Sequence, residues 1–170
     1  TVAPEGCILC GRCVGVCRHS AKRVRDDLPR VRALLWRDAN VQVSLAPSFI
    51  SEFPGIRPAQ LASALKKLGF AGVHETAEGA ERVSQVVAEL LDQANSGLFL
   101  SSACPVAVDL VVRHQPGLAS MLTPVMSPML AHARTLKARF GHDAAVVFIG
   151  PCIGKKRDAD RSPDLLHSAL

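Results

Sequence analysis

The sequence is poor in aromatic side chains: its 170 residues contain no tyrosine, one tryptophan and six phenylalanines. Proteins that bind single-stranded nucleic acid stack the bases on aromatic side chains, so this scarcity argues against a nucleic-acid partner, despite a net charge of +5 and a pI near 9.1. The densest basic stretch runs from Arg18 to Arg37 and also contains acids, which favours a solvated connector.

Long apolar runs are also lacking. The longest, such as AAVVFIG and SQVVAELL, are far shorter than the roughly 20 residues that cross a bilayer, and no secretory signal opens the chain. Because 48% of the residues are hydrophobic, 21% are charged and the mean hydropathy is +0.20, the chain can bury a core. These features predict a soluble, cytoplasmic protein with no membrane span.

Cysteine, in contrast, is present in an unusual arrangement. Four of the six cysteines are crowded into CILCGRCVGVC with the spacing C-x2-C-x2-C-x3-C: Cys7, Cys10, Cys13 and Cys17. The first three thiolates of such a run can wrap one iron–sulfur cluster, so the spacing predicts a 4Fe-4S cluster. Zinc is a weaker alternative, because structural zinc sites usually split their ligands into two distant pairs. A disulfide framework is weaker still without a secretory signal.

Cys17 is the weakest candidate ligand of the run. In two-cluster ferredoxins the fourth cysteine binds the other cluster, whose remaining ligands lie in a second run, and this sequence has no second run. Arg18 also stands where a proline usually follows. Six residues precede Cys7, without an initiator methionine, and we therefore expect this segment to be half of a two-cluster module.

Further along the chain, the hydrophobic pattern alternates between strand-like and helix-like periods. Strands are predicted at VQVSLAP, AGVHE, GLFLSS and DAAVVFIG, and helices at IRPAQLASALKKLGF, EGAERVSQVVAELLDQANSG, PVAVDLVVRHQPG and SPMLAHARTLKARFG. The inward positions predicted for the first two helices are Leu61, Leu65 and Leu68, then Val83, Val86, Val87, Leu90 and Leu91, and the second helix is expected to end at Asn95 to Gly97. This alternation is typical of an α/β domain with a mainly parallel sheet.

The two remaining cysteines follow predicted strands. Cys104 comes after GLFLSS and Cys152 after AAVVFIG, so we expect both at the carboxyl edge of the sheet, where open α/β folds bind ligands. The helix dipole favours a thiolate at a helix start. A free cysteine is often only a small buried hydrophobe, but two in equivalent positions favour a ligating or reactive role.

Two other chemistries fit less well. FIGPCIGKK has Ile149 where a P-loop needs its first glycine and Lys156 where it needs serine or threonine. A catalytic cysteine–histidine pair is open to any of six histidines, but none is adjacent in sequence to Cys104 or Cys152. The histidines on predicted strand or helix faces are expected to be structural: His74, His114 and His132.

The order of these motifs resembles the FeFe hydrogenase family. A ferredoxin-type cysteine run is followed by APS, by Ser-Ser-x-Cys-Pro and by Pro-Cys-x-x-Lys-Lys. SLAPSFISEFPG, SSACPVAVDLVVRHQPGLASMLTPVMSPM and FIGPCIGKKRDAD are similar to the branch whose hydrogenase domain is fused to sensor or signalling domains. The resemblance implies an N-terminal ferredoxin-like 4Fe-4S segment at 1–25, a connector at 26–40 and a hydrogenase-like H-cluster domain at 41–170, incomplete at its C-terminus.

The resemblance also implies site residues. Cys104 and Cys152 would be two of the four thiolates that hold the 4Fe-4S part of the H-cluster, and Lys155 would face a cyanide ligand of its two-iron unit. Ala46 and Pro47 would line the two-iron pocket. The N-terminal cluster would relay electrons to the H-cluster from a redox partner such as ferredoxin.

Three departures from the family pattern bear on hydrogen turnover. The other two H-cluster cysteines of the family lie in a C-terminal element, E-x-x-x-C-x-x-G-C, that this sequence does not contain. Ala103 stands where catalytic members carry a proton-relay cysteine, and a methyl group cannot transfer a proton. Asp158 replaces the usual glutamate of the proton path, and Gly150 replaces a methionine of efficient enzymes. Lys155 and Asp158 remain the candidate catalytic residues.

Three functional hypotheses stay open. Ala103 favours an H2-responsive sensor or low-turnover hydrogenase that signals to further domains, such as a PAS or phosphatase-like region. The second hypothesis is a fragment of an active ferredoxin-linked hydrogenase, which joins two protons and two electrons to make H2. The third is a plain 4Fe-4S electron-transfer module, and the retained Lys155 counts against it.

Overall fold

The computed structural model describes residues 2–37, 40–94 and 97–170. Its core is a sheet of four parallel strands in the order β2–β1–β3–β4. The strands are β1 (Val41–Leu45), β2 (Gly72–Glu75), β3 (Ala145–Ile149) and β4 (Ser168–Ala169). Leu45 is in register with both Glu75 and Ile149, so β1, β2 and β3 end level at one edge. The predicted α/β class with a parallel sheet is confirmed.

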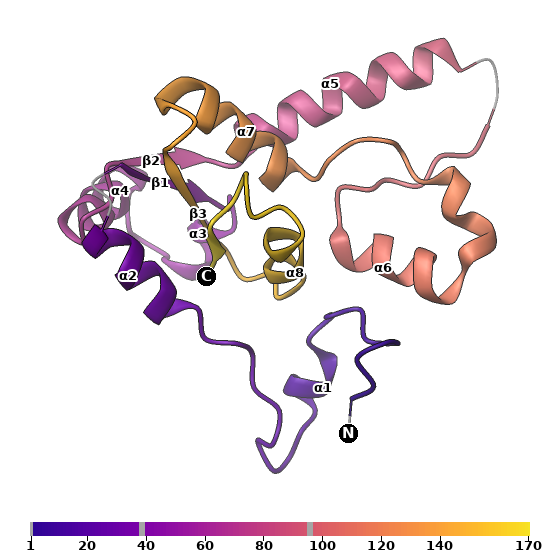
Figure 1. The fold of residues 1–170 in the computed structure, drawn as a ribbon, viewed down its shortest axis with the longest axis horizontal. Coiled ribbons are helices and arrows are strands. Elements are labelled where there is room, and N and C mark those ends of the chain that lie inside the picture. Colours follow the sequence, from indigo (N-terminus) through magenta and orange to yellow (C-terminus); the bar gives the residue numbers. More distant parts are fainter. Residues whose placement is uncertain (1, 38–39, 95–96) are drawn as a thin grey trace.

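Helices cover both faces of this sheet (Figure 1). Their bounds are α1 (Arg12–Gly15), α2 (Leu28–Arg37), α3 (Phe49–Glu52), α4 (Pro58–Lys67), α5 (Ala77–Gln93), α6 (Pro105–His114), the 3-10 helix η1 (Pro116–Met121), α7 (Pro128–Phe140) and α8 (Gly154–Asp160). None of the helices in the described residues is both long enough and apolar enough to cross a membrane.

Side-chain alternation along β1 and β3 divides the core in two. Val41, Val43 and Val147 pack with Val31 of α2 and with the leucines of α4 on one face. Val146 and Phe148 pack on the other face with α7, α8 and β4: Met129, Leu130, Ala133, Leu136, Ala159 and Ala169. Because successive side chains of a strand point to opposite faces, apolar residues at consecutive positions of β3 serve both layers.

The predicted helices at α4, α5, α6 and α7 and the strands β1, β2 and β3 are confirmed. Pro58, Pro105 and Pro128 each stand in the first turn of a helix, where the missing N–H costs no hydrogen bond. Ser127 caps α7 as expected, since its side chain accepts a hydrogen bond from the Leu130 N–H.

The strand predicted at GLFLSS is wrong. In this segment Leu100 forms one isolated parallel bridge with Leu122, through bonds from the Leu100 N–H to Met121 O (2.7 Å) and from the Thr123 N–H to Leu100 O (2.8 Å). Leu98 is 67% exposed, because the alternating apolar side chains find no buried face here. Cys104 therefore does not follow a strand of the four-stranded sheet.

Several inward positions predicted on the helices are also wrong. Val83 is buried on α5, but Val86 and Leu91 are 44% and 50% exposed, because α5 extends beyond the helix α7 on which it packs (Figure 1). Leu68, at the end of α4, is 68% exposed. The helix end predicted at Asn95 and Ser96 lies outside the described residues.

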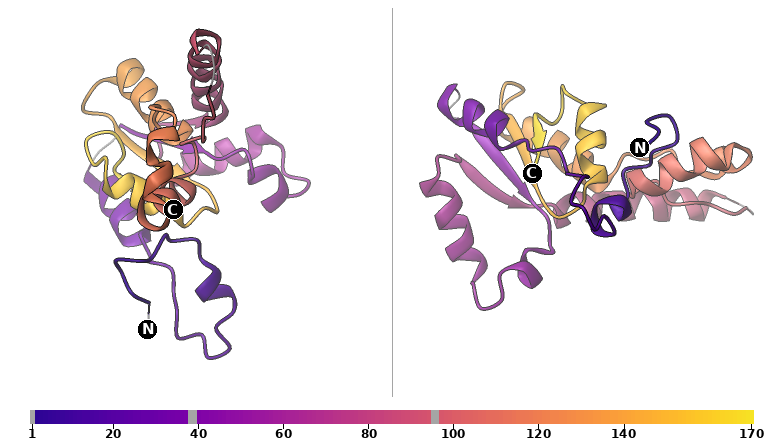
Figure 2. Two further views of the ribbon diagram at one scale, coloured as in Figure 1. Left: turned by 90° about the vertical axis from the view of Figure 1, so that its right-hand side faces the viewer. Right: turned by 90° about the horizontal axis from the view of Figure 1, so that it is seen from below.

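Six elements of the described residues were not predicted: α1, α2, α3, η1, α8 and β4. The expected connector at 26–40 contains α2, which buries Val31; residues 38–39 of that connector lie outside the described residues. The short elements α8 and β4 follow Cys152, and their few residues carry too little periodicity to predict. The N-terminal segment has a single helical turn, α1, and lies outside the sheet layers, near α6 and α8 (Figures 1 and 2).

Candidate functional site

The carboxyl ends of β1 and β3 meet at the expected edge of the sheet. The Ala46 N–H donates to Ile149 O over 2.8 Å, which holds the two strand ends together. A cavity of about 260 Å³ opens here, and Ala46, Phe49, Gly150 and Pro151 are among the residues that line it. Pro47 is exposed and does not line this cavity. Of the two residues expected to line an apolar pocket, Ala46 and Pro47, only Ala46 lines this one.

Gly150 has no room for a side chain. A Cβ atom built at this position would lie 2.7 Å from Ala46 Cβ and 2.7 Å from Phe148 Cζ, closer than real Cβ atoms come to other atoms. The methionine of efficient enzymes would therefore require Ala46 or Phe148 to move. The close approach of residues 46 and 150 is possible because residue 150 has no side chain and residue 46 has only a methyl group.

The packing of α6 against α8 relates the two isolated cysteines. Cys104 is the N-cap residue of α6, Cys152 lies two residues before α8, and both side chains are exposed. A Cβ at Gly154 would lie 2.5 Å from Val106 Cγ2 and 3.7 Å from Cys152 Sγ. The missing side chain of Gly154 therefore lets the start of α8, with Cys152, approach the first turn of α6.

Lys155 connects these two helix starts. Its Nζ donates to Ala103 O over 3.3 Å and lies 3.6 Å from Asp158 Oδ2. The side chains of Lys155 and Asp158 are only 12% and 14% exposed. Ser127 Oγ donates to the same Asp158 oxygen over 2.5 Å. Polar contacts thus run from the Ala103 carbonyl through Lys155 and Asp158 to the start of α7, and the sequence indicated Ser127 only as a helix cap.

The cysteine run surrounds a separate cavity of about 670 Å³. Cys7, Cys10 and Cys13 line it, whereas Cys17 does not. Its other lining residues are mainly apolar or basic: Val2, Gly6, Ile8, Leu9, Gly11, Val14, Lys22, Arg23, Val24, Arg25, Ile153, Lys156 and Asp160. Arg25 and Lys156 are already paired with Asp27, and the positive charges of Lys22 and Arg23 would offset part of the negative charge of several thiolates. The composition of this cavity fits an iron–sulfur cluster held by the first three cysteines.

The backbone around Cys7 supports the same fit. The Leu9 N–H donates to Cys7 Sγ over 3.4 Å, a contact of the kind that tunes iron–sulfur clusters. Gly11 has a φ of 80°, and a Cβ there would lie 2.6 Å from Ile153 Cδ1, so glycine allows this loop to pack against the residue that follows Cys152.

Cys17 has a different environment. Backbone N–H groups of Ala21 and His19 lower the pKa of its thiol, which favours a thiolate, yet Cys17 does not reach the cavity of the other three. Within residues 2–37, 40–94 and 97–170, no three cysteine, histidine or acidic side chains are grouped closely enough to hold a metal ion. Metal binding is coupled to folding, and ligation by the run would require its thiols to converge.

The basic and histidine side chains near these sites have structural partners. Lys156 Nζ donates to Asp27 Oδ2 (2.8 Å) and to Ala169 O (2.7 Å), so it is not free to bind a phosphate. His74 Nε2 lies 3.0 Å from Gln42 Oε1. His132 is fully buried, and its Nδ1 lies 2.8 Å from Ser44 Oγ.

His132 predicts a measurable pH dependence of stability. Burial lowers its pKa to about 4, although the Glu78 carboxylate acts in the opposite direction. The unfolded chain takes up this proton below pH 6.5, whereas the folded chain does not, so stability falls as the pH drops from 6.5 towards 4. Between pH 7 and pH 5 the loss from this residue should be about 2 kcal/mol.

Urea unfolding at the two pH values tests this prediction. His132→Gln should remove most of the difference. Part of the slope should persist, because burial also lowers the pKa of His74. Equal slopes in the variant and the parent protein would contradict the assignment to His132.

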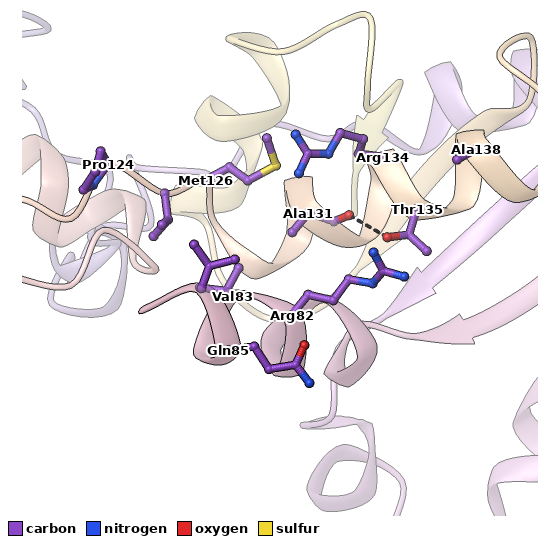
Figure 3. A pocket seen from close by; sticks show the side chains of 11 residues that line it. Arg82, Val83, Gln85, Pro124, Met126, Ala131, Arg134, Thr135 and Ala138 are labelled. Carbon is purple, nitrogen blue, oxygen red and sulfur yellow. Dashed lines mark hydrogen bonds between the residues drawn. The ribbon is translucent and has the colours of Figure 1, made fainter. Parts of the chain in front are cut away.

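A third cavity, of about 460 Å³, lies between α5 and α7 (Figure 3). It shares no lining residue with the other two cavities. Arg82 and Gln85 of α5 and Arg134 and Thr135 of α7 line it together with Met126. It contains no cysteine or acid, and therefore none of the candidate ligands.

The chain was compared with known families and structures. The family model described as the iron-only hydrogenase large subunit, C-terminal domain, matches residues 39–165. A solved structure from work on oxygen inactivation of FeFe hydrogenase, initiated by modification and degradation of the 2Fe subcluster of its H cluster, matches with a TM-score of 0.66 and 24% identity. The match covers 86% of this chain and 45% of that chain. No curated protein matches significantly. The chain thus spans less than half of that hydrogenase, with which it shares its fold.

Proposed function

The chain belongs to the iron-only hydrogenase large-subunit family, and from this premise we propose that it is an H2-responsive iron–sulfur protein, either a sensor or a low-turnover hydrogenase. Cys104 and Cys152 are its ligands to the 4Fe-4S part of an H-cluster. Residues 1–25 form a ferredoxin-type segment whose cluster, on Cys7, Cys10 and Cys13, exchanges electrons with a redox partner such as ferredoxin. Its output goes to a further region, such as a PAS or phosphatase-like domain.

The observation that carries this proposal is the contact between Lys155 Nζ and Ala103 O, 3.3 Å apart. It fixes a nearly buried ammonium between the segments that contain Cys104 and Cys152. A fixed positive charge in a shielded site is suited to an anionic ligand such as cyanide. The neighbouring Ala103 offers only a methyl group where a proton donor would be needed. The site therefore keeps a cation for binding the anionic ligand and lacks the proton donor for rapid H2 turnover.

The bound H-cluster would supply the interconversion of H2 with two protons and two electrons. The residues of this chain contribute binding and exclusion of water. Ala46, buried at the end of β1, and Gly150 present an apolar surface at the sheet edge. Asp158 accepts a hydrogen bond from Ser127 and balances the charge of Lys155. None of these contacts provides a proton to a ligand beside Ala103.

An active, ferredoxin-linked hydrogenase is the second candidate. The 2.5 Å bond between Ser127 and Asp158 favours it, because a carboxylate within hydrogen-bond reach of a hydroxyl is the type of contact along which protons move. The plain electron-transfer module is disfavoured, because it has no anionic ligand for the nearly buried ammonium of Lys155, which would then contact only Ala103 O and Asp158.

Restoring a thiol at the missing proton relay tests the choice between a sensor and an enzyme. Ala103→Cys, placed in a full-length form that carries the family's C-terminal cysteine element and then matured, should raise the rate of H2 evolution by roughly 10²-fold, the lower range for general acid–base catalysis. Ala107→Cys, which adds a thiol elsewhere on α6, is the matched control and should leave the rate unchanged.

Infrared bands of bound CO and cyanide must be recorded for each protein, so that cofactor loading is known. An unchanged rate in fully loaded Ala103→Cys would refute the role of Ala103. Absence of these bands in the parent protein after maturation would overturn the H-cluster itself.

A further inference from the structure

Side chains of α6 and α8 form hydrogen bonds with the backbone that leads into Cys7. Arg113 donates to Pro4 O over 3.2 Å and also to Glu5 O. The Nε2 of His114 donates to Gly6 O over 2.9 Å, and Arg157 Nη1 donates to Cys7 O over 2.7 Å. Four consecutive carbonyls, residues 4–7, are thus bound by three side chains, which we call the carbonyl clamp: Arg113, His114 and Arg157.

The clamp is anchored on Asp109, a carboxylate of α6 that is only 3% exposed. Its Oδ2 accepts a hydrogen bond from Arg157 Nη1, the same atom that binds Cys7 O, and its Oδ1 accepts one from Arg161 over 2.7 Å. Burial favours the neutral acid, but the hydrogen bonds from Arg161 and Arg157 outweigh it and hold the pKa of Asp109 below its usual value. The carboxylate therefore stays ionised and fixes the Arg157 guanidinium.

The position of this network in the chain connects the two cysteine sites. Asp109 and Arg113 lie on the helix that begins after Cys104, and Arg157 lies on the helix that follows Cys152. Both helices therefore hold the same loop, the one that ends in Cys7. Further along the cysteine run, Gly11 lies against Ile153, the residue after Cys152. The N-terminal segment beside α6 and α8 is visible in Figure 2.

We propose that the carbonyl clamp positions the N-terminal cluster against the Cys104–Cys152 site and that Arg157 raises the reduction potential of this cluster. The inference rests on the proposed function, because it requires a cluster on the N-terminal run. A reduced cluster carries one more negative charge than an oxidised one, so a fixed cation hydrogen-bonded at Cys7 favours reduction. Arg157 and Arg113 are positioning residues, since they act through the backbone of the ligand loop.

Arg161 gives a matched control, because it binds Asp109 but makes no bond to Cys7. In the full chain reconstituted with iron and sulfide, a redox titration followed by electron paramagnetic resonance should give a more negative potential for Arg157→Gln. Arg161→Gln should keep the parent potential. Arg157→Lys, which retains the positive charge, should recover most of the shift.

A second measurement needs no cluster. The Cys7 N–H donates to Pro4 O within the clamped loop over 3.4 Å, so hydrogen exchange at this amide reports on the loop. Exchange in the metal-free chain should rise severalfold in Arg157→Gln and in Arg113→Gln, and should not rise in Arg161→Gln.

The outcomes separate the two levels of the proposal. If the parent chain takes up no iron–sulfur cluster, the proposed function fails and the inference fails with it. If the cluster forms and Arg157→Gln has the same potential as Arg161→Gln, the inference alone is overturned. Equal exchange at Cys7 in the parent, Arg113→Gln and Arg157→Gln proteins would likewise overturn the clamp.

Discussion

Cys10→Ser should lose the N-terminal iron–sulfur cluster, whereas Cys17→Ser should retain most of its iron. Cys10 lines the 670 Å³ cavity together with Cys7 and Cys13, and Cys17 does not. Loss of even an outer partner of a metal ligand typically costs roughly 10- to 100-fold in metal affinity, and removal of a direct ligand should cost at least as much. The expected contrast is therefore a decrease in bound iron of about tenfold or more against a small one.

Iron and sulfide analysis after reconstitution, with the visible absorbance of the cluster, measures this contrast. Cys104→Ser is a useful control, because it removes a thiol that does not line this cavity and should leave the N-terminal cluster intact. Equal losses from Cys10→Ser and Cys17→Ser would show that all four thiolates converge when metal binds. Full retention in Cys10→Ser would contradict the assignment of the cavity.

Gly79→Ala is expected to have the largest effect on stability. A Cβ at this position, in the first turn of α5, would lie 2.2 Å from the Pro128 carbonyl oxygen and 2.7 Å from His132 Cβ. Both neighbours belong to α7, and neither a backbone oxygen nor a buried side-chain stem can move away freely. Overpacking of this kind typically costs 1–3 kcal/mol and occasionally more, so the free energy of unfolding should fall by about 3 kcal/mol.

The matched control is Gly117→Ala, because a Cβ at Gly117 would meet no atom within 4 Å and its φ is not positive. Loss of backbone freedom in the unfolded chain should make this variant neutral or more stable by up to about 1 kcal/mol. Urea unfolding midpoints compare the two proteins. A Gly79→Ala midpoint equal to that of Gly117→Ala would mean that α5 does not pack against α7 in solution as the structure has it.

The elements that sequence predicted correctly carry a local signal, either a chemical signal at one end or an uninterrupted apolar run. Ser127 and Pro128 mark the start of α7, and Pro105 marks that of α6. Strand β3 is apolar at every position, as a strand covered on both faces must be. These signals are local, since a cap or a proline acts through the backbone of its own turn.

GLFLSS failed for the opposite reason. Its alternation is that of a strand, but strand formation depends on a neighbour with free backbone groups, and in the structure this segment finds only Leu122. Val86 and Leu91 on α5 are exposed for the same reason, because the sequence does not show the packing partner. A periodic apolar face indicates which side of a helix can be buried, but not how far the neighbouring helix extends along it.

Some features of the candidate site could be predicted from local sequence, and others could not. The spacing of the cysteine run and the order of the motifs indicated the family, which the family model confirms, and they singled out Cys104, Cys152 and Lys155 without any geometry. The sequence could not indicate that Asp109 holds Arg157 against the Cys7 carbonyl, because 48 residues separate the two charged side chains and 150 separate Arg157 from Cys7.

The sequence by itself therefore determined the class of fold, the family and the residue types available for metal chemistry, because periodicity, turn residues and ligand spacing are properties of short segments. Only the tertiary structure decided that α6, which Cys104 caps, packs against α8, which begins two residues after Cys152. It also decided that a side chain at Gly150 would collide with Ala46, and that Cys17 does not line the cavity of Cys7, Cys10 and Cys13. These are contacts between segments distant in sequence, and they depend on steric fit and on paired charges that no local pattern encodes.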